Sequence, residues 1–277
     1  MNTFSYHPCQ PGYYQAGKKY QELNYSEDCK LGEVVCQMFE VTSPREHNIR
    51  VIPDGCNDIL ISYDGEQINS WYSPSITKST NFHFKKAEWV FGVRFYPGAD
   101  CSLLRGSIPV SKSHPIEVKE LLPDFDSLDD ELKKSMSFVR RHEIVEDYLL
   151  ARIKPRNNVE DILSSSVRFL IDANGVISIE KLAKAVGYST RYLRQLFTDY
   201  IGHSSKELAN MIRMQKTLYC LLEERDQKLS DIAIRYGFSD QSHMNREFKK
   251  YMGVTAKIIK ERGQWNSILG AELSRIF

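Results

Sequence analysis

The sequence predicts a two-domain α+β protein: a β-barrel or β-sandwich followed by helices comes first, and an all-α double helix-turn-helix unit comes second. Three observations predict this organisation. Residues 34–96 contain short segments rich in branched and aromatic residues, and residues 99–153 carry apolar residues at helical spacing. Residues 179–259 contain two copies of one helical pattern. At 277 residues the chain is long enough for two such domains.

The N-terminal strands are predicted from runs of β-branched and aromatic residues that are bounded by Pro, Gly, Asp and Asn. Asp64-Gly65 is typical of a hairpin turn, and Pro53-Asp54-Gly55 predicts another sharp turn. These features indicate a compact sheet or barrel with strands at Val34–Val41, Asn48–Ile52, Asp58–Tyr63, Ile68–Tyr72 and Trp89–Tyr96.

The pattern becomes helical after Pro97-Gly98, with helices expected at Ala99–Leu104, Ile116–Leu122, Leu128–Met136 and Val139–Ile153. The apolar stripe of the last helix, formed by Ile144, Val145, Tyr148 and Leu149, fits packing on its own barrel and packing on a second subunit equally well. Lys154–Asn158 has the composition of a linker. We therefore expect domains at residues 1–155 and 160–263, with a tail at 264–277.

The last third of the chain contains an internal repeat. The first copy runs from Ile179 to Leu208 and the second from Leu229 to Ile259, with equivalent positions 50 residues apart up to Ser189 and Ser239 and 51 apart beyond them. Two copies are too few for a solenoid, which needs about three units to bury a continuous core. The repeat therefore predicts two small paired units.

Each copy has the features of a helix, a tight turn and a second helix. Gly187 and Gly237 supply the positive φ that ends the first helix. Ser189, or Ser239 with Asp240, can cap the second helix. The small residues Ala183 and Ala233 allow the two helices to cross closely, as in a helix-turn-helix.

This region, from about Leu163 to Arg262, resembles the AraC/XylS family of bacterial transcription regulators, whose DNA-binding unit has two helix-turn-helix subdomains joined by a long helix. A capping box at Ser204 and Glu207 would begin that joining helix, which would run to Leu222. The sequence departs from the family at Ser204-Ser205 and Thr255-Ala256, where Ser-Pro is common. The resemblance is carried above all by Gly237-Phe238-Ser239-Asp240-Gln241-Ser242-His243-Met244-Asn245-Arg246-Glu247-Phe248-Lys249.

Helical phase predicts which side chains of the second helix in each copy contact DNA. In the second copy, the residues that point away from Met244 and Phe248 can contact bases, because Arg pairs with guanine and Gln or Asn with adenine. Lys249 is better placed for phosphate, which sets affinity rather than sequence. The alternative for each Arg is an ordinary solvated surface charge. The predicted base-contacting residues are Thr190, Arg191, Arg194, Gln195, Gln241, Ser242, Asn245 and Arg246.

Charge and composition are compatible with this division. Residues 160–277 contain 18 Lys and Arg against 14 Asp and Glu, a net charge of +4, whereas residues 1–159 carry 19 against 22, or −3. We find no leader peptide and no apolar run of spanning length, so we expect a cytoplasmic, bacterial protein that associates with the nucleoid when bound to DNA and has no membrane partner. The six cysteines include no Cys-x-x-Cys pair, which argues against a zinc site or a disulfide framework.

The N-terminal half resembles the sensor-type domain of some regulators in this family, in which Pro-Asp-Gly-Cys and Arg-Phe-x-Pro-Gly segments recur; here they are Pro53–Cys56 and Arg94–Gly98. The resemblance implies a cupin-like barrel that senses an effector and carries helices used for dimerisation. Aromatic residues and an arginine could line the barrel mouth and bind a small effector; the candidates are Trp71, Trp89 and Arg94. The alternative is an aromatic core with Arg94 paired to Asp54 or Asp58.

The chain contains no catalytic motif and no metal-ligand spacing, and we predict no enzyme activity, metal or cofactor. The main hypothesis is a sequence-specific transcription regulator that binds double-stranded DNA and is controlled by a small-molecule effector. Further predicted partners are RNA polymerase and a second copy of the chain. Two alternatives stay open: an alkyl-transfer or other enzymatic N-terminal domain, with Cys56 as the candidate thiol, and a regulator controlled by a protein partner.

Overall fold

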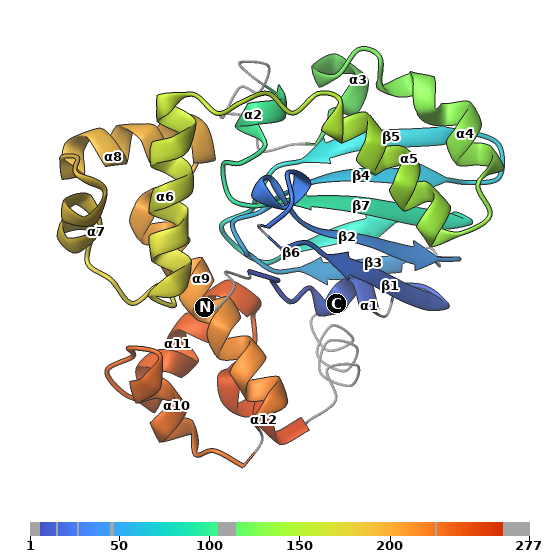
Figure 1. The fold of residues 1–277 in the computed structure, drawn as a ribbon. Helices are drawn as coiled ribbons and strands as arrows, with labels where there is room; N and C mark the ends of the chain where they lie inside the picture. The colour runs from blue at the N-terminus through green and yellow to red at the C-terminus, as the bar shows by residue number, and fades with distance from the viewer. Residues whose placement is uncertain are drawn as a thin grey trace.

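The computed structural model describes residues 6–14, 16–26, 28–44, 47–104, 115–224 and 226–262, which form a sheet domain and a helical domain packed against each other (Figure 1). This order confirms the predicted α+β class, whereas the predicted tail at 264–277 lies outside the described residues. The first part contains α1 (Pro11–Tyr14), β1 (Lys19–Asn24), the 3-10 turn η1 (Leu31–Glu33), β2 (Val35–Thr42), β3 (His47–Val51), β4 (Asn57–Tyr63), β5 (Ile68–Ser73), β6 (Thr80–Phe84), β7 (Trp89–Phe95), α2 (Cys101–Leu104), β8 (Ile116–Glu117), α3 (Val118–Leu121), the 3-10 turn η2 (Phe125–Leu128), α4 (Asp129–Lys134) and α5 (Phe138–Leu150).

Six strands form one antiparallel sheet in the order β1-β2-β7-β4-β5-β8, and β3 pairs with β6 in a separate two-stranded ribbon. Apolar residues from the ribbon and from one face of the large sheet share a core, so the two sheets form a sandwich rather than a closed barrel. The five predicted strands are confirmed to within one residue at each end. Three further strands, β1, β6 and β8, were not predicted.

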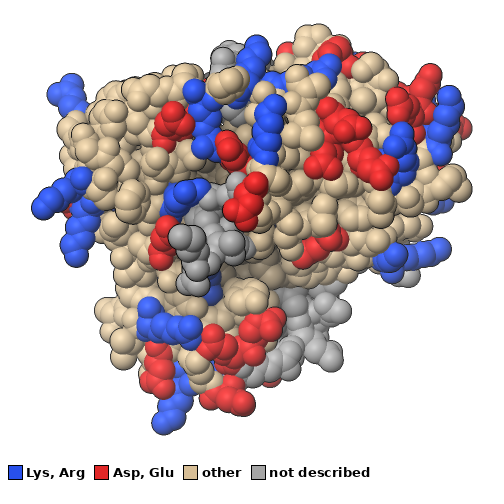
Figure 2. Space-filling model, viewed as in Figure 1, with Lys and Arg blue, Asp and Glu red and all other residues tan. Residues whose placement is uncertain are grey.

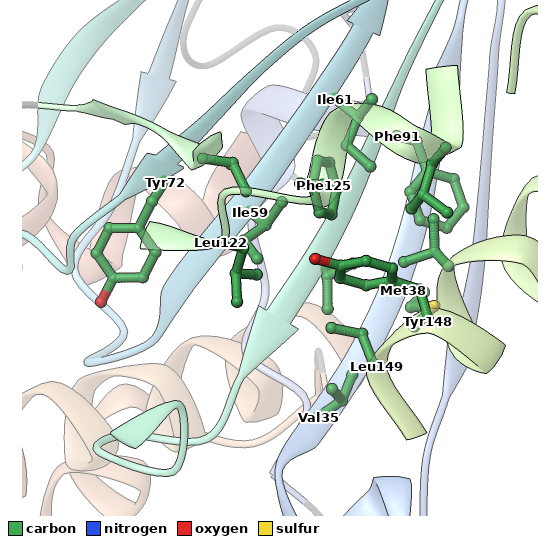
Figure 3. Packing of buried hydrophobic residues seen from close by; sticks show 14 of the residues in the cluster. Val35, Met38, Ile59, Ile61, Tyr72, Phe91, Leu122, Phe125, Tyr148 and Leu149 are labelled. Carbon is green, nitrogen blue, oxygen red and sulfur yellow. The ribbon is translucent and has the colours of Figure 1, made fainter. Parts of the chain in front are cut away.

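The other face of the large sheet is covered by α3, α4 and α5 (Figure 1). Side chains from β2, β4, β5 and β7 meet side chains from these helices in the largest core of the domain (Figure 3). Tyr148 also donates a hydrogen bond from its hydroxyl to Asp124, over 2.8 Å. The apolar stripe of α5, including Tyr148 and Leu149, is therefore buried on its own sheet. The predicted helix at Ile116–Leu122 is wrong in its first turn, because Ile116 pairs with Tyr72 in β8.

Arg94 is fully buried beneath the sheet and has its charge balanced by two carboxylates. Its Nε and Nη2 donate to the two oxygens of Asp58 over 2.9 and 2.8 Å, and the Asp54 carboxylate lies 3.8 Å away. Burial alone would lower the pKa of Arg94, but Asp58 and Asp54 raise it well above its usual value. This arrangement is the paired-arginine alternative of the sequence analysis, and Arg94 is a core residue.

The helical domain follows the predicted plan. The joining helix α9 begins after Ser204, whose hydroxyl accepts from the backbone of Glu207 in the predicted capping box. A capping box at Asn157 and Glu160 likewise begins α6, which was not predicted as a helix. No helix in the described ranges is long and apolar enough to cross a bilayer. The elements are α6 (Asn158–Asp172), α7 (Ile179–Val186), α8 (Thr190–Leu196), the π turn η3 (Phe197–Ile201), α9 (Ser205–Glu223), α10 (Leu229–Arg235), α11 (Gln241–Met252) and α12 (Ala256–Arg262).

The joining helix α9 packs on the sheet domain through polar and apolar contacts. Its buried Gln215 accepts from the backbone N–H of Cys9 over 3.0 Å and donates to the carbonyl of Pro53 over 3.1 Å. Leu208 fills the space beside Gly55, where a Cβ would lie 2.3 Å from its Cδ1. Because the cores of both helix-turn-helix units also include residues of the sheet domain, both units rest on it.

A second contact joins the β3–β6 ribbon to the C-terminal end of α11. The backbone N–H of Ser79, just before β6, donates to the carbonyl of Tyr251 over 3.1 Å. Arg50 of β3 donates from Nε to the hydroxyl of Ser79, and its guanidinium occupies the space that a Cβ at Gly253 would need. The ribbon therefore contacts the last turn of α11 directly.

His203 forms a third contact, between the π turn and the sheet domain. Its Nε2 lies 2.5 Å from the hydroxyl of Ser75, and Asn57 holds Ser75 by accepting from its backbone N–H over 2.8 Å. The ring is buried, and burial lowers the pKa of His203, while the nearby Glu207 carboxylate opposes that shift. Burial at this interface therefore favours the neutral form of the imidazole.

We predict that acid weakens the fold through His203. Because its folded pKa lies below the unfolded value near 6.5, the unfolded chain binds more protons, so stability is lost as pH falls below about 6.5. Urea unfolding midpoints measured from pH 7.5 to pH 5 should fall less for His203→Gln than for the wild type. The exposed His83 provides the control, because the urea midpoint of His83→Gln should fall with pH as steeply as that of the wild type. Equal slopes for all three proteins would contradict the prediction.

Candidate nucleic-acid interface

The second helix of the first unit, α8, presents its polar face to solvent. Leu193 and Leu196 are buried in the core of the unit, whereas Arg191, Arg194 and Gln195 are exposed. The hydroxyl of Ser189 accepts from the backbone of Tyr192 at 3.2 Å and caps the helix as expected. Thr190, the first residue of α8, is half-buried.

The second helix of the second unit, α11, has the equivalent arrangement. Met244 and Phe248 are fully buried, and Ser242, Arg246 and Lys249 are exposed. Gln241 and Asn245 are half-buried. The N-cap is Asp240, whose carboxylate accepts from the backbone of His243 over 2.7 Å, so Asp240 and not Ser239 caps this helix.

Four cations on these helices are available to a negatively charged ligand. Within the described part of the chain, no hydrogen bond or ion pair ties up the head groups of Arg191, Arg194, Arg246 or Lys249. Lys and Arg side chains also project along the left edge of the molecule, over α7 and α8 (Figure 2). Exposed, unpaired cations can neutralise phosphates and contact base edges.

Two predicted base-contacting residues already have partners within the protein. The Nε2 of Gln195 donates to both oxygens of Asp199, over 2.8 and 2.7 Å. The Oδ1 of Asn245 accepts from the backbone N–H of Lys257, over 3.2 Å, at the start of α12. Asn245 therefore helps to hold α12 in place, a role that helical phase did not reveal. The DNA-contacting role of all nine residues stays a prediction.

The two turns use the predicted glycines, but in different surroundings. Gly187 has φ +77° and Gly237 has φ +71°, both in the left-handed region. A Cβ at Gly187 would meet nothing within 4 Å, whereas one at Gly237 would lie 2.6 Å from Cγ1 of Val176. The turn of the second unit is therefore packed against the loop between α6 and α7, and that of the first unit is open.

The structure does not bring Trp71, Trp89 and Arg94 together in one effector site. Leu60 pairs with both Trp71 and Gly92 across the sheet, which places Trp71 and Arg94 on one face and Trp89 on the other. Trp71 lines a cavity of about 860 Å³, and Trp89 lines a different one of about 760 Å³. Arg94 lines neither. The single barrel mouth expected from the sequence is therefore wrong.

Cys56, the candidate thiol of the enzymatic alternative, is buried at the base of the Pro-Asp-Gly turn. Burial raises the pKa of the Cys56 thiol well above its usual value, and the nearby Cys36 and Asp54 act in the same direction. A reactive thiol needs a lowered pKa and access to its substrate. The surroundings of Cys56 disfavour nucleophilic chemistry.

Two family models match the chain in separate regions. A helix-turn-helix domain model matches residues 182–262, which contain α8, α9 and α11. A model described as a domain of unknown function (DUF6597) matches residues 28–114, within the sheet domain.

Curated relatives match the C-terminal third. The probable transcription factor PqrA of Proteus vulgaris is 31% identical over 107 residues, which cover 38% of this chain and 87% of PqrA. The multiple antibiotic resistance protein MarA of Escherichia coli (strain K12) is 33% identical over 103 residues, covering 36% of this chain and 79% of MarA. The transcriptional regulator Rob of Salmonella typhimurium is 29% identical over 92 residues, covering 33% of this chain and 31% of Rob.

Solved structures align at low TM-scores. A regulator with an AraC-type DNA-binding domain from Chromobacterium violaceum has a TM-score of 0.36 and 20% identity, over 38% of this chain and 95% of that chain. Unsaturated-fatty-acid-bound ToxT from Vibrio cholerae has a TM-score of 0.40 and 14% identity, over 80% of this chain and 92% of that chain.

We predict that the two turn glycines differ in their tolerance of alanine. Gly187→Ala should cost about 1 kcal/mol, because only the left-handed backbone is strained. Gly237→Ala should cost more, because the new methyl group also collides with Val176. Urea unfolding of the two variants measures the difference, and an equal loss of stability would show that Val176 does not support the second turn.

We also predict different effects for Arg246 and Lys249. Arg246→Ala should cost about 1 to 3 kcal/mol of binding and relax preference at one base pair, whereas Lys249→Ala should weaken binding to all DNA equally. Fluorescence anisotropy with a specific and a scrambled duplex, each over a salt series, separates the two effects. An equal, sequence-independent loss from both variants would remove Arg246 from the base-contacting set.

Proposed function

The chain belongs to the AraC/XylS family of DNA-binding transcriptional regulators, and we propose that an effector bound in its sheet domain controls how its two helix-turn-helix units engage DNA. Its activity is sequence-specific DNA binding in transcription regulation. The assignment of individual DNA contacts, of the effector site and of the coupling between them is our proposal.

One observation carries the DNA-binding part of the proposal: α8 and α11 both keep a polar face exposed although both units are packed on the sheet domain. In Figure 1 the sheet domain lies to the right of α9, and α7 and α8 lie at the far left. DNA contacts by α8 and α11 therefore do not require the domains to separate. We propose that α8 and α11 enter successive major grooves, about 34 Å apart.

Selection of binding sites from a random DNA library by the full-length chain tests this part. The expected result is an enriched sequence with two footprints one helical turn apart and a steep salt dependence of affinity. Enrichment of a single short footprint would contradict the use of both units, and sequence-blind binding would contradict base contact by either.

The cavity beside Trp71 is the effector site that we propose. Trp71 and Phe82 form its apolar floor, with their ring centroids 6.3 Å apart and the planes within 19° of parallel. The indole Nε1 of Trp71 is buried and, among the described residues, finds no acceptor. Charged residues of both signs also line the cavity: Lys85, Lys86, Lys119, Asp64, Glu117, Asp126 and Asp129. A flat molecule with a hydrogen-bond acceptor would use these groups, because a buried donor without a partner is costly.

The β3–β6 ribbon links this cavity to DNA binding. Phe82 and His83 of β6 line the cavity, and Ser79, directly before the same strand, donates its backbone N–H to Tyr251 at the end of α11. A ligand that shifts β6 would therefore act on α11 through one short strand. In this proposal the effector selects one of two positions of the ribbon, and so changes the population of chains that can bind DNA.

We predict that the fluorescent probe 8-anilino-1-naphthalenesulfonate binds the cavity and reports on Trp71. Binding to the wild type should be saturable, and Trp71→Phe should weaken it by roughly tenfold, because the ring remains but the buried N–H is lost. The control is Trp89→Phe on the opposite face of the sheet, which should bind the probe as the wild type does. Equal affinities of the wild type and Trp71→Phe would place the probe, and the proposed site, elsewhere.

RNA polymerase and a second copy of the chain are further partners in the proposal, within the bacterial cytoplasm where the DNA lies. Dimerisation cannot use the apolar stripe of α5, because that stripe is buried on its own sheet. Exposed apolar side chains beside it, Met136 and Val139, offer the nearest alternative surface. Sedimentation of the free chain and of the chain on its selected DNA site tests the stoichiometry directly.

A further inference from the structure

Gln195 of α8 is held in one orientation by Asp199. The two residues are one helical turn apart, both are exposed, and Nε2 of Gln195 lies at nearly equal distances of 2.8 and 2.7 Å from the two carboxylate oxygens. One N–H of the carboxamide therefore points between the two oxygens. Asp199 lies in the π turn that continues α8, which keeps it beside Gln195.

This contact decides which edge of the carboxamide faces outward. A free glutamine can exchange the positions of its oxygen and its NH₂ group by rotating half a turn. A carboxylate accepts hydrogen bonds and repels a carbonyl oxygen, so Asp199 keeps the nitrogen toward itself and the oxygen away. The edge left for a ligand offers Oε1 as an acceptor and the second N–H as a donor, side by side.

That edge matches adenine in the major groove. Adenine presents a donor at N6 beside an acceptor at N7, and glutamine pairs with both through its oxygen and one N–H. Guanine presents two acceptors and would meet the glutamine oxygen unfavourably. A carboxamide fixed in advance also loses less rotational freedom on binding, which favours the matching base further.

The second helix-turn-helix unit has a different pair at the equivalent positions. At the 51-residue offset of the repeat, Gln195 corresponds to Arg246 and Asp199 to Lys250. An aspartate beside Arg246 would neutralise it, whereas beside Gln195 it supplies an acceptor. The two positions therefore change as a pair between the units. Gln195 with Asp199 suits contact with adenine, and Arg246 without a neighbouring carboxylate at the equivalent position suits contact with guanine.

We propose that Asp199 is a positioning residue that orients Gln195 to select adenine at one base pair of the first half-site, while Arg246 selects guanine in the second. This inference rests on the proposed entry of α8 into the major groove. The carboxylate also lowers affinity for phosphate in general, so Asp199 exchanges some affinity for discrimination between bases.

The test is binding-site selection with four full-length proteins: wild type, Gln195→Ala, Asp199→Ala and the double variant. Gln195→Ala should abolish an adenine preference at one position. Asp199→Ala should reduce the same preference by about threefold to tenfold, and should leave the base preferences of the second half-site unchanged. The double variant should show the same base preferences as Gln195→Ala alone, because Asp199 affects base preference only through Gln195.

The control for the lost charge is Asp161→Ala. Asp161 is an exposed carboxylate in the first turn of α6, and its removal should leave the base profile of the wild type intact. A retained preference in the second half-site, together with an unchanged urea unfolding midpoint, shows that each variant is folded.

Three results would overturn the inference. The base preferences of Asp199→Ala could equal those of the wild type, or the base preferred at the position that Gln195→Ala affects could be one other than adenine. The third is an effect of Asp199→Ala on base preference that persists in the absence of Gln195. Failure of the underlying function has a different signature, because the wild type would then enrich no first half-site at all. Loss of the adenine preference in the Asp199 and Gln195 variants alone cannot result from such a failure, because the wild type would still enrich the first half-site.

Discussion

The packing of α9 on the sheet domain is the constraint on which the remaining structure depends. The carboxamide of Gln215 bonds with two backbone groups of the sheet domain, at Cys9 and Pro53, and both of its ends are thereby satisfied. Because Gln215 is buried, separating the domains would leave these polar groups without those partners until water reached them. The apolar packing of Leu208 beside Gly55 adds area, but the polar contacts set the register.

A joining helix fixed in this way determines where α8 and α11, the second helices of the two units, point. Each unit packs on α9, so α8 and α11 inherit their separation from one rigid element. The ribbon contact at Tyr251 and the His203 contact then act at the two ends of that arrangement, one beside α11 and one beside η3. Under the proposed mechanism, an effector in the sheet domain would not need to unfold or release a unit, because β6 follows Ser79, which bonds to Tyr251 near the end of α11.

Local sequence patterns predicted most of the fold, and long-range register accounts for what they missed. The strands rich in branched residues were found, but β1 (Lys19–Asn24) is a polar edge strand with almost no apolar alternation. The helix α6 begins with a capping box at Asn157 and Glu160, which is a local sequence signal for a helix start. Trp71 and Trp89 were grouped because both are aromatic strand residues, and only their register through β4 shows that they lie on opposite faces.

The predicted DNA-contacting faces of α8 and α11 show the same difference between what helical spacing predicts and what depends on a distant partner. Helical periodicity predicts that the side chains of Gln195 and Asn245 lie outside the buried apolar stripe, because this depends only on their spacing along the helix. It does not predict that Asn245 accepts a hydrogen bond from α12, since that helix lies twelve residues further along the chain. The Gln195 and Asp199 contact spans a single turn and was accessible from sequence alone. The residue type gives no signal of it, because a carboxylate is unfavourable for phosphate binding and the chemistry of DNA contact points to cations and amides. The proposed role of Asp199, which orients Gln195, explains an acidic residue beside the exposed face of α8 better than attraction of a ligand does.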